Sequence, residues 1–132
     1  MADIDITSTS TEGYATTSGI GEWELTVDAT DQQGPNPNAV LAADYASCFI
    51  PAFRVGAQQE GFEDLGAIQV DVAADLDDDD DLSGIAFDIA VEASLGDSVD
   101  DVVARAEDIC HVHSALREDL HADISVADGA DL

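Results

Sequence analysis

Hydrophobic and polar residues alternate in three short segments at the start of the chain. Alternation with period two predicts β-strands with one buried and one solvated face, and glycine-containing turns separate the segments. The clearest of them places Trp23, Leu25 and Val27 on one side and glutamate, threonine and aspartate on the other. We therefore expect a three-stranded antiparallel meander with Trp23, Leu25 and Val27 facing the core. The three segments are residues 3–10, 14–18 and 22–28.

A long helix is predicted next, from Pro37 to about Gly61. Asn36 is a favourable N-cap, and proline suits the first helical position because its missing N–H would be unpaired there anyway. The residues that follow are small and apolar on nearly every side, which is typical of a buried helix. Pro51 removes one backbone hydrogen bond and predicts local curvature.

The second half of the chain alternates between strands and a helix. Strands are predicted at residues 68–72, 85–95 and 120–126, and an amphipathic helix at 99–110. The order β-β-β-α-β-β-α-β predicts a single α+β domain over residues 1–132, with sheet covering a central helix.

Three local signals refine this second half. The acidic run Asp77–Asp81 lacks the ligand spacing of an EF-hand calcium loop and is interpreted as a solvated hairpin turn. Ser98 with Asp101 three positions later resembles a capping box at a helix start. Residues 127–132 are small and acidic and are expected to form a frayed tail.

The chain is strongly acidic: it carries 30 Asp and Glu against 3 Lys and Arg, a formal net charge of −27. The acid is spread over the whole chain, as in proteins of salt-accumulating halophiles. Self-repulsion at this charge destabilises a compact state, and strong salt reduces its range to roughly 3 Å. Nucleic acid is excluded as a partner because no basic patch is present to neutralise phosphates.

The chain shows no signal peptide and no apolar run judged long enough to span a membrane, which favours a cytoplasmic protein. It has two cysteines, Cys48 within the predicted central helix and Cys110 at the end of the second helix. Two cysteines in such a protein indicate redox chemistry or buried packing more than a structural disulfide.

Two motifs resemble those of the OsmC/Ohr family. The first is GPNPNAVLAADYASCF at residues 34–49, similar to the family's helix that carries a cysteine before phenylalanine. The second is CHVHSAL at residues 110–116, similar to the family's CPVSxAL segment, with His111 in place of proline and His113 in place of serine. The element order matches as well.

The resemblance implies an intertwined homodimer with active sites at the subunit interface, and a thiol-dependent reductase of hydroperoxides without a cofactor or metal. Cys48 would attack the peroxide and become a sulfenic acid. Cys110 would then condense with Cys48 to a disulfide, and an external dithiol would reduce the pair.

The sequence departs from the family at two activating residues, an arginine of the N-terminal strands and a glutamate early in the central helix. No arginine precedes Arg54, and Asn38 stands where the glutamate is expected. Asp44, one turn before Cys48, disfavours a thiolate there. An alternative function is therefore an OsmC-fold relative without peroxidase activity, which binds a small apolar molecule or is redox-inert.

Several other side chains are candidates to take over the activating role or to form a different kind of site. The candidate activators are Arg54, Arg105, Arg117, His111, His113 and Asp44. A third hypothesis is a metal site formed by Cys110, His111, His113 and His121, although its spacing is unlike that of zinc motifs.

Overall fold

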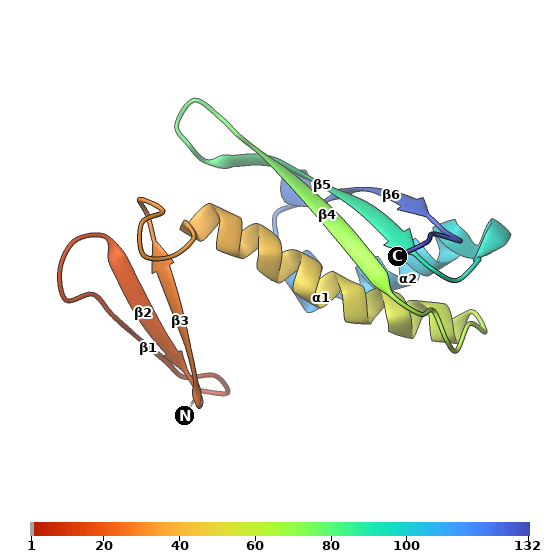
Figure 1. Cartoon of the computed structure of the whole chain (residues 1–132), viewed down its shortest axis with the longest axis horizontal. Helices are drawn as coiled ribbons and strands as arrows, with labels where there is room; N and C mark the ends of the chain where they lie inside the picture. Colours follow the sequence, from red (N-terminus) through yellow and green to blue (C-terminus); the bar gives the residue numbers. More distant parts are fainter. Residues whose placement is uncertain (1) are drawn as a thin grey trace. The chain divides into compact units, whose positions relative to one another are not determined.

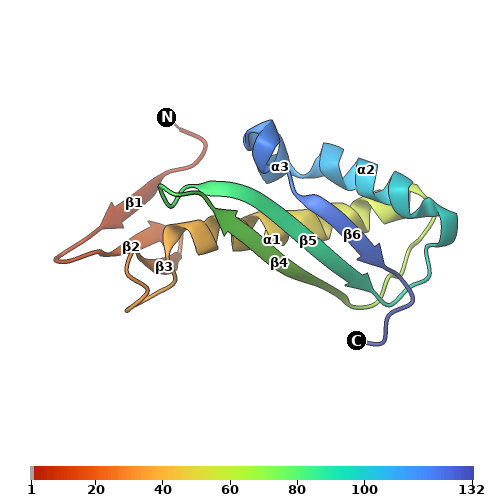
Figure 2. The ribbon, with the colours of Figure 1, turned by 90° about the horizontal axis from the view of Figure 1, so that it is seen from above.

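The computed structural model describes residues 2–132 and confirms the α+β class and the predicted element order. Figures 1 and 2 show its two three-stranded sheets and its long helix. The chain divides into one compact unit that ends at Leu41 and another from Ala42 to Leu132. The strands are β1 (Ile6–Thr9), β2 (Ala15–Ile20), β3 (Trp23–Asp28), β4 (Ile68–Leu76), β5 (Leu82–Val91) and β6 (Asp123–Ala127). The helices are α1 (Pro37–Gln59), α2 (Val99–Ile109) and α3 (His111–Ala115), with short 3-10 turns at Gly96–Ser98 and Glu118–Leu120.

The N-terminal sheet has the predicted meander order β1-β2-β3, with antiparallel pairing throughout. Ile6, Ile20 and Trp23 are aligned across the three strands, so they share one face. The expectation that this face belongs to the core is wrong. Trp23 is 77% exposed and Leu25 is 40% exposed, so this face is not buried within the N-terminal unit.

Helix α1 begins as predicted, at Pro37. The Ala39 N–H donates to Asn36 Oδ1 at 2.9 Å, which is the expected N-cap bond. The helix continues without interruption through Pro51 to Gln59. The part of it that follows Ala42 buries Tyr45, Phe49 and Phe53 completely.

By length and composition α1 is also apolar enough to cross a membrane, so the expectation that no such segment exists is wrong. A core helix of a globular domain meets the same criterion. In the most apolar 18-residue stretch of α1, 39% of the residues are buried inside the protein.

The C-terminal sheet has the order β4-β5-β6, with β4 antiparallel and β6 parallel to β5. The later part of α1 runs along one face of this sheet, with α2 beside it (Figures 1 and 2). The inward side chains of β5 are at most 4% exposed between Ile85 and Val91. Gly56 of α1 allows α2 to approach closely, since a Cβ there would lie 3.1 Å from the Val102 carbonyl oxygen. One core cluster therefore includes residues of α1, β5 and α2.

Hydrogen bonds in the turns and at the C-terminus confirm one sequence-based prediction and contradict two. Asp77–Asp81 forms the predicted hairpin turn between β4 and β5. Ser98 makes no capping bond; the carboxylate of Asp128 instead accepts N–H bonds from Leu95 and Gly96, at 2.6 and 3.1 Å, just before α2. The predicted frayed tail is also wrong as far as Ala130, whose N–H bonds to the Val91 carbonyl at 2.9 Å.

Candidate active site

Cys48 lies on the wall of a cavity of about 210 Å³. It is half-buried, and Pro51, Ala52 and Val55 follow it on the same face of α1 because they are three, four and seven residues further on. Ile109 and His111, on either side of Cys110, complete the lining. The cavity is therefore apolar apart from one thiol and one imidazole.

Cys110 lies in the link between α2 and α3 and is 1% exposed. Cys48 is close enough to raise the pKa of Cys110, and both cysteines are free. Its Sγ also accepts the backbone N–H of His113 at 3.4 Å, which makes Cys110 the N-cap of α3. Burial raises the pKa of Cys110 to about 11, and the neighbouring Cys48 acts in the same direction. The structure thus brings together the two predicted cysteines, one facing a cavity and one enclosed.

A buried polar network lies beside the cysteine pair. The hydroxyl of Tyr45 is 2.5 Å from Nδ1 of His113 and accepts the Ala122 backbone N–H at 3.1 Å. The Tyr45 hydroxyl therefore pairs with Nδ1 of His113 while it accepts the Ala122 N–H. The network joins α1, α3 and the segment that leads into β6.

The surroundings of His113 keep it neutral. Its ring stacks on His121, with 3.8 Å between ring centroids, and His121 Nε2 is 3.2 Å from the Leu116 carbonyl oxygen. Glu107 Oε2 is 4.0 Å from His113 Nε2. Burial, and then the neighbouring His121, lower the pKa of His113, while Glu107 opposes that change. His113 is therefore a structural histidine rather than a cation beside the thiols.

The arginines proposed as replacements for the family's cation are engaged or placed elsewhere. Arg105 pairs with Glu60 at 3.0 Å and also donates to Gln59, and Arg117 pairs with Asp119 at 3.4 Å. Arg54 is half-buried on α1 and is not among the residues that line the cavity. No arginine side chain therefore lines the cavity of Cys48 within residues 2–132.

The structure also shows where the two remaining positions of interest on α1, Asn38 and Asp44, lie. Asn38 occupies the first turn of α1, so no carboxylate stands at that position. Asp44 is exposed and makes no hydrogen bond to Cys48 in the described part of the chain. Nor does any group of three or more metal-ligating side chains converge among residues 2–132, so Cys110, His111, His113 and His121 do not form the hypothesised metal cluster.

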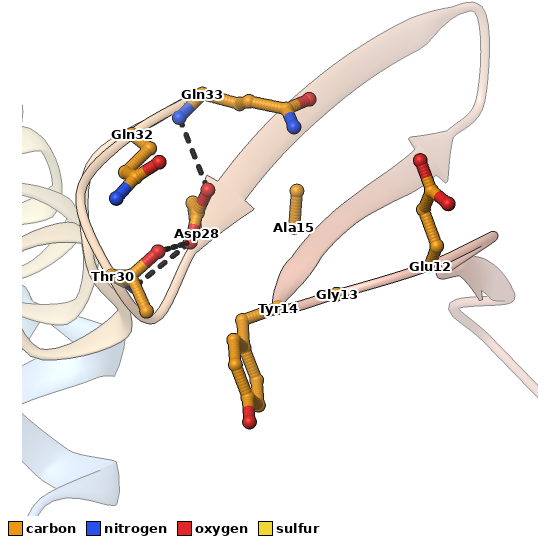
Figure 3. A pocket seen from close by; sticks show the side chains of 8 residues that line it. All are labelled: Glu12, Gly13, Tyr14, Ala15, Asp28, Thr30, Gln32 and Gln33. Carbon is orange, nitrogen blue, oxygen red and sulfur yellow. Dashed lines mark hydrogen bonds between the residues drawn. The ribbon is translucent and has the colours of Figure 1, made fainter.

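The N-terminal unit has a separate cavity of about 500 Å³ (Figure 3). Asp28 lies on its wall, and one carboxylate oxygen accepts the backbone N–H and the hydroxyl of Thr30 at 2.8 and 2.7 Å. The other oxygen accepts the Gln33 N–H at 3.1 Å. These hydrogen bonds lower the pKa of Asp28. The bond from the Thr30 hydroxyl has the largest effect on it. Both carboxylate oxygens of Asp28 therefore accept hydrogen bonds that hold the loop that precedes α1.

Comparison with known families agrees with this arrangement. The model of the OsmC family, described as OsmC-like protein, matches residues 29–125. The chain belongs to the OsmC family. The match includes both cysteines, the cavity and the Tyr45–His113 network, but not β1, β2 and β3.

Relatives with solved structures share the OsmC fold over nearly their whole length. An OsmC-like protein from Mycoplasma pneumoniae superposes with a TM-score of 0.83 at 17% identity, covering 96% of this chain and 97% of that one. The organic hydroperoxide resistance protein OhrB of Bacillus subtilis gives 0.71 at 21% identity, covering 96% and 98%. At these identities the likeness shows the fold.

A much closer relative is a protein of Haloferax volcanii, described as uncharacterized. It is 55% identical over 131 residues, which cover 98% of this chain and 99% of the relative.

Sequence reasoning missed Tyr45 as a member of the site and considered His121 only as a metal ligand. A tyrosine within an otherwise small and apolar helix was a usable signal, because a buried hydroxyl needs a hydrogen-bond partner. Nothing local in the sequence identifies that partner as His113, 68 positions further on.

Proposed function

We propose that this protein is a thiol-dependent hydroperoxide reductase in which Cys48 attacks the peroxide and Cys110 resolves the product. The observation that carries the proposal is that Cys48 of α1 shares a cavity lining with Ile109 and His111, the two chain neighbours of Cys110, and is close enough to affect the pKa of Cys110. Neighbouring thiols of this kind are suited to forming a disulfide after one of them is oxidised.

The unequal surroundings of the two thiols support this division of roles. Cys48 faces the apolar cavity of about 210 Å³, which suits the alkyl group of a small organic hydroperoxide. Cys110 is enclosed, and a pKa of about 11 keeps it a thiol at neutral pH. A buried thiol is poorly placed to meet a substrate but well placed to meet a neighbouring sulfenic acid.

The proposed cycle balances in three steps. The Cys48 thiolate attacks one peroxide oxygen, the O–O bond breaks, and Cys48 becomes a sulfenic acid while an alcohol leaves. The Cys110 thiol condenses with the sulfenic acid to a disulfide and releases water. An external dithiol then reduces the disulfide by exchange and is itself oxidised. Hydroperoxide resistance is part of the name of the Bacillus subtilis relative, in agreement with this class of reaction.

A second candidate function is a redox-inert OsmC-fold protein that binds a small apolar molecule in the same cavity. It is favoured by Asn38, and by the ion pairs that hold Arg105 and Arg117 away from the cavity. The two candidates differ in one measurable property, which is whether peroxide converts the two thiols to a disulfide.

The homodimer and the cytoplasmic location belong to the same proposal. A three-stranded sheet with an exposed apolar face, as Trp23, Leu25 and Ile20 form in this chain, is expected to pair with another surface. A second copy of this chain is the partner we propose. Two free cysteines suit the reducing conditions of the cytoplasm.

Peroxide consumption decides between the two functions. Purified protein in 3 M KCl is mixed with tert-butyl hydroperoxide or hydrogen peroxide, with dithiothreitol as reductant. We expect turnover by the wild type, none by Cys48→Ser, and a single sulfenic acid in Cys110→Ser that dimedone traps. Intact-mass analysis should show the loss of two hydrogens in the peroxide-treated wild type. Absence of both turnover and disulfide would support the redox-inert protein.

A further inference from the structure

The cavity of Cys48 contains one side chain that is able to exchange a proton with the thiol and with a bound peroxide. That side chain is the imidazole of His111. The other four residues of the lining are Pro51, Ala52, Val55 and Ile109, which carry no titratable group. Within residues 2–132, His111 is therefore the one other titratable side chain in the lining of the Cys48 cavity.

The other histidines are occupied and His111 is not. His113 is bound to Tyr45 through Nδ1, and His121 is bound to the Leu116 carbonyl through Nε2. The His111 side chain is exposed and makes no hydrogen bond or ion pair within residues 2–132. Both of its ring nitrogens are thus available for chemistry.

The local backbone explains why His111 and Cys110 have different surroundings although they are neighbours. Cys110 is the N-cap of α3 and His111 is the first residue of that helix. The Cys110 side chain is buried toward the core, whereas Ile109 and His111 on either side of it border the cavity. This arrangement sets an imidazole and the Cys48 thiol on the same cavity wall.

We propose that His111 is a catalytic residue, the general base for Cys48 and the general acid for the leaving oxygen. This inference rests on the proposed function. His111 takes the Cys48 proton, and the thiolate attacks one oxygen of the hydroperoxide. The O–O bond breaks, the sulfur is oxidised to a sulfenic acid, and the departing alkoxide receives the proton from His111 as an alcohol. The imidazole ends neutral, and hydroperoxide is the only oxidant consumed.

The role suits the chemistry of an imidazole in a site that lacks arginine. An imidazole can take up a proton at a free ring nitrogen and return it within one reaction cycle. The titratable groups on the elements around His111 are Asp44, Tyr45, Cys48 and Arg54 of α1, Asp100, Asp101, Arg105, Glu107 and Asp108 of α2, and His113 of α3, with Cys110 adjacent in the chain. Of these, only Cys48 shares the cavity wall with His111.

The test isolates the first step in a Cys110→Ser background, where oxidation stops at the sulfenic acid. Two rates are measured between pH 5.5 and 9.5 in 3 M KCl: the formation of dimedone-trapped Cys48 with tert-butyl hydroperoxide, and the alkylation of Cys48 by iodoacetamide. The variants are His111→Gln and the control Ser114→Gln, which changes an exposed residue of the same helix. Circular dichroism checks that the variants melt like the parent.

We expect His111→Gln to slow peroxide oxidation by about 100- to 10,000-fold at pH 7. The parent rate should reach a plateau within this pH range. In His111→Gln the plateau should vanish and the rate should climb about tenfold per pH unit, so that the difference in rate between the two proteins narrows as the pH rises. Ser114→Gln should leave both rates unchanged.

Two results would count against different parts of the proposal. Equal rates and equal pH profiles in the parent and in His111→Gln would overturn the role of His111 and leave the proposed function standing. A parent that does not react with peroxide overturns the proposed function and the acid step of His111. The alkylation rates then still decide the base step, because alkylation needs the thiolate but no peroxide.

Discussion

The strands of both three-stranded sheets alternate hydrophobic and polar residues, but the apolar face of one sheet is buried and that of the other is exposed. In β5, Phe87 and Val91 are completely buried by the helices of their own unit. In β3, Trp23 is 77% exposed on the apolar face of the N-terminal sheet. Alternation therefore identifies a strand and its apolar face, but it carries no information about which surface covers that face. For the N-terminal sheet, we propose that the covering surface belongs to a second copy of the chain.

Salt should produce the largest difference between the two sheets. The net charge of −27 acts on both units, but only the C-terminal one has a buried core that opposes the repulsion. The screening length falls from about 10 Å at 0.1 M to about 3 Å at 1 M salt. We therefore expect the fold to be lost in dilute buffer, and β1, β2 and β3 to lose amide protection at a higher KCl concentration than β4, β5 and β6.

Amide hydrogen exchange between 0.1 and 4 M KCl measures this difference. Thermal melting followed by circular dichroism over the same range is the control for the whole chain. A melting temperature that does not change with salt, or a C-terminal sheet that opens first, would contradict the prediction.

Removing a core side chain of the C-terminal sheet should cost the most among single substitutions. Phe87→Ala leaves a cavity between Tyr45 and Phe49, whose rings are 4.7 and 5.5 Å from that of Phe87. The free energy of unfolding should fall by about 3–5 kcal/mol. Urea unfolding in 3 M KCl measures it, with Ala86→Gly on the other face of β5 as the control. A loss below about 1 kcal/mol would mean that the aromatic cluster is not the core of the unit.

Breaking the proposed dimer through the N-terminal sheet should have a smaller effect that depends on concentration. Trp23→Glu puts a charge on the apolar face, and loss of a buried tryptophan from an interface costs about 2 kcal/mol or more, roughly a 30-fold rise in the dissociation constant. Sedimentation velocity in 3 M KCl measures the association. Glu24→Gln, on the opposite face of the same strand, should leave it unchanged. If wild type and Trp23→Glu sediment alike, this face is not the interface.

Some of these structural features could be predicted from the sequence, and others could not. Local signals were sufficient for the Asn36 cap, the Asp77–Asp81 turn and the order of the elements, because each depends on residues close together in the chain. The family resemblance pointed to Cys48 and Cys110 as a pair; Cys48 is close enough to raise the pKa of Cys110, and the redox roles of the two cysteines stay a prediction.

Long-range pairings were not predictable in the same way. The Asp128 carboxylate bonds to the Leu95 N–H, where local reasoning gave a cap by Ser98. The Tyr45–His113 bond joins residues 68 positions apart and leaves no periodic pattern in the sequence. Such contacts are selected by tertiary packing, which local propensity does not encode.

The smallest predicted effect concerns a buried carboxylate and a buried imidazole, Asp28 of the N-terminal unit and His113 of the C-terminal unit. Burial lowers the pKa of His113 below its ordinary 6.5, so the unfolded chain binds this proton more readily than the native one. The contribution of His113 is therefore present above about pH 6.5 and is lost as the pH falls below it. Hydrogen bonds lower the pKa of Asp28 from 3.8, so its contribution persists until the pH falls below about 3.8.

As the pH falls from neutral, the C-terminal unit should therefore begin to lose stability about three pH units before the N-terminal loop does. Protonation of the many surface carboxylates relieves repulsion over the same range, so the useful quantity is the difference in free energy of unfolding between wild type and variant at each pH. With His113→Gln that difference should shrink between pH 7 and pH 5, and with Asp28→Asn it should shrink only below pH 4. Urea unfolding at fixed 3 M KCl measures both. If the two differences changed over one common pH range, the assignment of separate roles to a neutral imidazole and an ionised carboxylate would be wrong.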